Sequence, residues 1–174
     1  MTTTEIIVTI FSSSVLSAGL TGLITWKLKQ NEFKKTVFVN FINKRLEAYS
    51  ELENLLGTFS IVFRDFDGRK YHSMFRDVKP YGQFFLNLGI ALKFNTWYSP
   101  EILKILNRIN DLQEDMWDLK FDESEESLTK NIEIGKSKYE KICRLRDELT
   151  AQIRNDFKTI HITDFKKFFG ETKR

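Results

Sequence analysis

A charge-free stretch near the N-terminus constrains this chain more than any other feature of its sequence. Between Glu5 and Lys27 there is no Asp, Glu, Lys or Arg, whereas the chain that follows is rich in all four. The 21 residues over 6–26 would span roughly 30 Å as a helix, about the thickness of a bilayer's hydrocarbon core. We therefore expect 6–26 to form an uncleaved transmembrane anchor behind a short extracytoplasmic N-terminus over 1–5.

Basic residues lie only on the C-terminal side of this stretch, which predicts its orientation. The positive-inside rule places the N-terminus outside and the C-terminal domain in the cytoplasm, as expected of a single-pass protein of the cell membrane. We expect a basic juxtamembrane linker over 27–35. The residues predicted to lie at the membrane interface are Trp26, Lys27, Lys29, Lys34 and Lys35.

Polar residues within the stretch leave a second interpretation open. Seven of its 21 residues are Ser or Thr, which lowers its hydrophobicity and makes a buried helix of a soluble protein the alternative. The hydroxyl and small side chains recur every fourth residue, an arrangement that allows close packing between membrane helices. Alternatively, each hydroxyl bonds the carbonyl four residues earlier in its own helix. The predicted packing residues are Thr9, Ser13, Ser14, Ser17, Ala18, Thr21, Gly22 and Thr25.

Helical periodicity continues through most of the remaining chain. Apolar residues three and four positions apart predict helices over roughly 33–64, 81–95 and 126–159. Between the first two of these, Asp67-Gly68 indicates a turn, and we expect a loop or short helix over 65–80.

Ser99-Pro100-Glu101 marks the beginning of a further helix. Ser is a favoured N-cap, Pro suits the first helical position, and an acid in the first turn complements the helix dipole. Four helices with short connections alternate in direction, so we expect a cytoplasmic bundle over 36–159. The predicted fold is all-α: an N-terminal single transmembrane helix followed by an antiparallel four-helix bundle.

Lysines and phenylalanines alternate in the C-terminal tail over 160–174. This composition suits an anionic interface, and a bundle of this topology would return the tail toward the bilayer. The alternative is that the phenylalanines pack on the bundle while the lysines are solvated. The residues of this possible second membrane contact are Phe165, Lys166, Lys167, Phe168 and Phe169.

Motifs that would identify a reaction are missing from the sequence. There is no Gly-rich phosphate loop, nucleophile elbow or zinc motif, and His72, His161 and Cys143 lack metal-ligand spacing. We expect no catalytic residues, no metal and no cofactor, and a net charge of +3 gives no reason to expect nucleic acid. The expected partners are the lipid bilayer and either a second copy or another membrane or cytoplasmic protein.

Taken together, these features predict a membrane-anchored helical interaction or scaffold protein without enzymatic activity. The alternative is a membrane-acting effector that oligomerises through its Ser/Thr-rich helix and perturbs the bilayer. An enzyme with a site between helices is a third possibility, because such sites need no contiguous motif.

Overall fold

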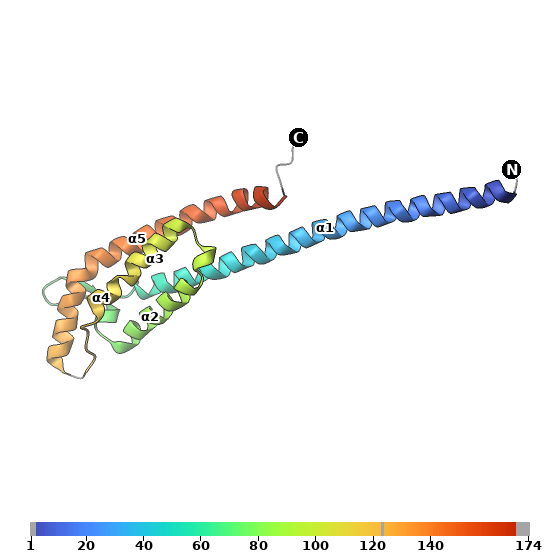
Figure 1. The fold of residues 1–174 in the computed structure, drawn as a ribbon. Coiled ribbons are helices and arrows are strands. Elements are labelled where there is room, and N and C mark those ends of the chain that lie inside the picture. The colour runs from blue at the N-terminus through green and yellow to red at the C-terminus, as the bar shows by residue number, and fades with distance from the viewer. Residues whose placement is uncertain (1–2, 123, 170–174) are drawn as a thin grey trace. The chain divides into compact units, whose positions relative to one another are not determined.

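The computed structural model describes the backbone of residues 3–122 and 124–169, and the side chains of residues 21–158 except 115 and 123 (Figure 1). The described chain is predominantly helical, which confirms the expected all-α class. It divides into two compact units. Residues 1–42 and 165–174 form the first unit, and residues 43–164 form the second.

Helix α1 (Thr3–Thr58) contributes residues to both units. Its backbone is helical throughout 27–35, where the sequence predicted a juxtamembrane linker. Every described side chain between Thr21 and Val37 is exposed, whereas Ala48 and Leu52 in the second unit are fully buried. One helix therefore carries both solvent-facing and core-facing segments.

The predicted location in the cell membrane is wrong. Among the described residues, no helix has a stretch that is both long enough and apolar enough to cross a bilayer. This finding contradicts the single-pass anchor and the orientation inferred from it, with the N-terminus outside and the C-terminal domain in the cytoplasm. Hydroxyl side chains make up a third of residues 6–26, and five charged residues follow directly over 27–35. Hydroxyl groups lower the hydrophobicity of the segment, and the charged residues after Trp26 prevent it from extending further, because charged groups are costly in hydrocarbon.

The second unit is a bundle-like arrangement of helices (Figure 1). It contains α2 (Val78–Lys93), α3 (Pro100–Asn110), the short α4 (Leu112–Met116), and the part of α5 (Glu125–Phe169) up to residue 164. The C-terminal turns of α1 belong to the same unit. Its core draws on all of the longer helices and includes the fully buried Leu52, Leu55, Phe59, Phe84, Leu88, Ile102, Leu106, Ile109, Ile142 and Leu149.

Capping hydrogen bonds begin two of these helices, and the sequence predicted the one at Ser99. The side chain of Ser99 accepts a hydrogen bond from the backbone N–H of Ile102 at 3.4 Å, and Pro100 occupies the first turn of α3. Asp77 caps α2 by accepting from the N–H of Lys79 at 2.9 Å. These bonds satisfy N–H groups that have no partner within the helix.

A small β-hairpin interrupts the helical succession, and the sequence did not predict it. Strands β1 (Val62–Arg64) and β2 (Lys70–His72) pair antiparallel, with Phe63 opposite Tyr71. The turn contains Gly68 at φ +80°, a backbone conformation that glycine adopts readily. The Asp67-Gly68 turn signal was therefore correct. Strands of three residues are too short to show an alternating pattern.

Two further boundaries differ from expectation. The helix that begins at Pro100 ends at Asn110, and α4 follows after Asp111, so two helices stand where the sequence predicted one further helix. Helix α5 continues to Phe169, through residues that were predicted to form a separate tail.

Within the second unit, a buried polar contact joins α1 to α5. The hydroxyl of Tyr49 donates to Oδ2 of Asp156 at 2.6 Å, and Nε2 of Gln152 donates to Oδ1 at 2.7 Å. Burial and the neighbouring carboxylate raise the pKa of Tyr49 well above its ordinary value. Tyr98 reaches α1 as well, donating from its hydroxyl to the carbonyl of Ala48 at 2.8 Å. Residues far apart in sequence thus fix the position of the α1 end.

Candidate functional site

Few of the residues predicted for membrane-helix packing can be placed. The side chains of Thr9, Ser13, Ser14, Ser17 and Ala18 lie outside the described residues, and so do those of the predicted tail contact over 165–169. Thr21, Gly22 and Thr25 are exposed, and a Cβ added to Gly22 would meet no atom within 4 Å.

The predicted interface residues, in contrast, lie next to an exposed apolar row on α1. Leu23 and Trp26 are each 64% exposed, Phe33 is 69% exposed and Val37 is 38% exposed. With Gln30 between them, these residues follow the 3-4-3-4 spacing of positions a and d in a coiled coil. We call Leu23, Trp26, Gln30, Phe33 and Val37 the α1 row.

Basic residues border the α1 row on both sides. At about 100° per residue around a helix, Lys27 and Lys34 lie along one edge of the row and Lys29 along the other. Glu32, the single acidic residue in the sequence over 23–37, lies toward the back of the helix together with Lys35. All five of these side chains are exposed. Of the residues that the sequence assigned to a lipid headgroup region, Trp26 thus belongs to the α1 row, Lys27, Lys29 and Lys34 border it, and Lys35 lies away from it.

Sequence reasoning missed the α1 row for a simple reason. The expected anchor ended at Trp26, and the first expected bundle helix was read from about residue 33, so the periodicity that joins the two was divided. The signal that could have found it is the spacing of Leu23, Trp26, Phe33 and Val37.

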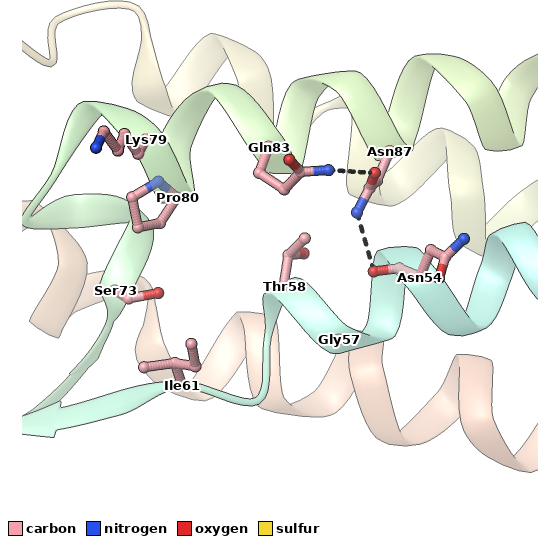
Figure 2. A pocket seen from close by; sticks show the side chains of 9 residues that line it. All are labelled: Asn54, Gly57, Thr58, Ile61, Ser73, Lys79, Pro80, Gln83 and Asn87. Atoms are coloured by element: carbon pink, nitrogen blue, oxygen red, sulfur yellow. Dashed lines mark hydrogen bonds between the residues drawn. The ribbon is translucent and has the colours of Figure 1, made fainter.

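The second unit contains a pocket of about 400 Å³ between the end of α1, the hairpin and α2 (Figure 2). Its lining comes from segments far apart in sequence: Asn54, Gly57, Thr58, Ile61, Ser73, Lys79, Pro80, Gln83 and Asn87. None of these nine residues is acidic, and none is His or Cys. The lining therefore offers amide and hydroxyl groups for hydrogen bonds and one cation, Lys79.

Most polar groups of the pocket are used within the protein. Gln83 donates from Nε2 to Oδ1 of Asn87 at 2.8 Å, and Asn87 donates from Nδ2 to the carbonyl of Asn54 at 3.0 Å (Figure 2). The Thr58 hydroxyl donates to the Leu55 carbonyl at 2.6 Å. The bond between Asn87 and Asn54 joins α2 to α1, whereas each of the other two lies within a single helix.

An acidic cluster at the hairpin surrounds a lysine of α5. The ammonium of Lys136 lies 2.5 Å from Asp65, 2.8 Å from Asp67 and 2.6 Å from Glu133. Arg69 also pairs with Asp67 at 2.7 Å and with Glu133 at 2.9 Å. Three carboxylates this close could hold a cation, but here Lys136 occupies their centre and holds the pKa of each below its ordinary value. We interpret the cluster as a structural ion-pair network.

His72 and Cys143 are neighbours in the structure although 71 positions separate them. His72 is fully buried, with its Nε2 3.9 Å from Sγ of Cys143 and its ring stacked on Tyr139 at 5.2 Å. Burial, reinforced by the positive charge of Arg146, lowers the pKa of His72 to about 4. A neutral, enclosed imidazole fits a core position better than a catalytic one.

Comparison with known proteins supplies no further assignment. No protein-family model, no curated protein and no solved structure matches this chain.

Proposed function

We propose that this chain is a non-enzymatic helical interaction protein that binds another protein through the α1 row. The observation that carries this proposal is the exposure of Leu23, Trp26 and Phe33, each about two-thirds exposed in one short helical segment. Single exposed apolar residues are normal on protein surfaces, but a contiguous set is typical of a binding surface. The regular spacing indicates a helical partner.

The second unit is consistent with a protein whose binding surface lies on the first unit. Its core is well buried, and we propose that its helices form the antiparallel four-helix bundle expected from the sequence. Several polar groups that line the pocket of this unit are bonded within the protein, which favours a structural role for them. The alternative of a membrane-acting effector required a spanning helix, and that prediction was contradicted.

Site-specific photocrosslinking tests the proposal on the full-length chain. A photoreactive phenylalanine analogue is placed at Phe33 or, as the matched control, at Leu28, which is 58% exposed on the opposite side of the same helix. In the native host, we expect an adduct of defined mass from position 33 and none from position 28. An excess of purified unmodified chain should compete the adduct away, whereas excess Phe33→Glu chain should not.

Equal labelling at both positions would contradict the proposal, because random collisions do not distinguish the two faces of a helix. Sedimentation velocity of the purified chain provides an independent check. A chain that fails to form any adduct and sediments as a monomer at all concentrations would leave the α1 row without a protein partner and would overturn the proposal.

A further inference from the structure

We infer, building on the function proposed above, that the partner of the α1 row is an acidic amphipathic helix rather than a second copy of this chain. Partner choice in paired helices depends on residues that flank the apolar seam, at positions e and g. With Leu23 at position a and Trp26 at position d, these flanking positions hold Lys27, Lys29 and Lys34.

The charges at these positions oppose pairing between two copies. In a parallel pair, a residue at g faces the residue five positions later on the other helix. Lys29 would therefore face Lys34 of the second copy. An antiparallel pair would bring Lys29 against Lys29, and Lys27 against Lys34. Both arrangements place like charges beside each other.

An acidic partner removes this conflict. Glu or Asp at its e and g positions would pair with the three lysines, while apolar a and d residues would cover the exposed Leu23, Trp26 and Phe33. Gln30 introduces one polar group at an a position, a feature that fixes the register of a pairing at some cost in affinity. Glu32 and Lys35 lie at outward positions and take no part in this pairing.

Two synthetic helical peptides of about three heptads provide the probe. Both carry Leu at a and d. One carries Glu at every e and g position, and the other carries Lys there. Binding of each labelled peptide to the full-length protein is measured by fluorescence anisotropy at low salt. We expect the acidic peptide to bind at least about tenfold more tightly than the basic one, and this preference to shrink at high salt.

Charge variants of the protein test whether the flanking lysines cause the preference. The triple variant Lys27→Glu, Lys29→Glu, Lys34→Glu should bind the basic peptide better than the acidic one. Lys35→Glu, which changes one equally exposed charge on the back of the helix, should leave the preference within about twofold of the wild type. Loss of the preference in Lys35→Glu to the same extent as in the triple variant would overturn the inference.

The outcomes also separate this inference from the function on which it rests. If both peptides bind equally, and Phe33→Glu but not Leu28→Glu abolishes binding, the acidic partner is excluded while the interaction role stands. If neither peptide binds the wild-type protein more tightly than it binds the Phe33→Glu variant, both the acidic partner and the proposed interaction role fail. Co-sedimentation of the wild type, but not of Phe33→Glu, with phosphatidylserine vesicles would assign the α1 row to a lipid surface and overturn the inference.

Discussion

Two leucines of helix α1 illustrate the difference between the two units. Leu52 is fully buried in the second unit, whereas Leu23, in the same helix, is 64% exposed in the first. Both belong to sequence segments with helical apolar periodicity. The second unit covers its apolar face with α2, α3 and α5, while the described part of the first leaves its row uncovered. Periodicity therefore identifies a face that needs covering, but not what covers it.

The largest expected effect tests this comparison directly. Leu52→Ala should lower the free energy of unfolding by about 2–5 kcal/mol, because it removes buried methyl groups and leaves a cavity. Leu23→Ala should change it by no more than about 0.5 kcal/mol. Urea unfolding followed by circular dichroism measures both. A comparable loss in the two variants would mean that the α1 row is packed within the chain.

Acid should weaken the second unit through His72. Its pKa is about 4 in the folded protein and about 6.5 when unfolded, so the unfolded state binds the proton first as the pH falls. The contribution of neutral His72 to the free energy of unfolding is therefore complete above pH 6.5. It is lost as the pH falls to 4, by roughly 3 kcal/mol in total. Unfolding free energies measured at pH 7 and pH 4.5 should differ less in His72→Gln than in the wild type. Identical pH dependence in the two proteins would exclude His72 as the source.

Two glycines provide a smaller contrast between the units. A Cβ at Gly135 in α5 would lie 2.7 Å from Cγ of the buried Phe75, so Gly135→Ala should destabilise the protein by about 1–3 kcal/mol. Gly22→Ala has open space and should stabilise α1 by about 0.5–1 kcal/mol through helix propensity. Thermal melts followed by circular dichroism distinguish the two. Stabilisation by Gly135→Ala would show that Phe75 can move aside.

The ion-pair network at the hairpin should give the smallest effect. The lowered pKa values of Asp65, Asp67 and Glu133 contribute stability above the ordinary carboxyl range, and this contribution is lost as the pH falls through their folded values. Lys136→Met removes the shared cation, so the variant should lose less stability between pH 7 and pH 3. High salt should reduce the difference between wild type and variant at pH 7. A difference at pH 7 that does not change with salt would contradict an electrostatic origin.

The sequence predicted the helices better than the hairpin that lies between them. The segment expected over 81–95 corresponds to α2 (Val78–Lys93), and the predicted start of α3 was correct because Ser99 and Pro100 act on their own helix turn. The hairpin was missed because the strands over 62–64 and 70–72 are too short to show the alternation of apolar and polar residues that identifies a strand.

For the candidate site, too, the sequence identified individual residues but not what surrounds them. Trp26, Lys27, Lys29, Lys34 and Lys35 were predicted to lie at the interface of a bilayer, because the uncharged stretch before them was given the greater weight. The complete α1 row follows only when residues on both sides of Lys27 are considered as one helix. The pocket between α1 and α2 could not be predicted, since its lining from Asn54 to Asn87 comes together only in the fold.

By itself, the sequence determined the helical class, the cap at Ser99 and the Asp67-Gly68 turn, because each depends on bonds and steric limits within a few residues. Only the tertiary structure decided that Tyr49 bonds Asp156, that His72 lies against Cys143, and that the α1 row stays exposed. The physical reason is range. Capping and turn formation are local, whereas the burial of a side chain depends on which distant segment packs against it.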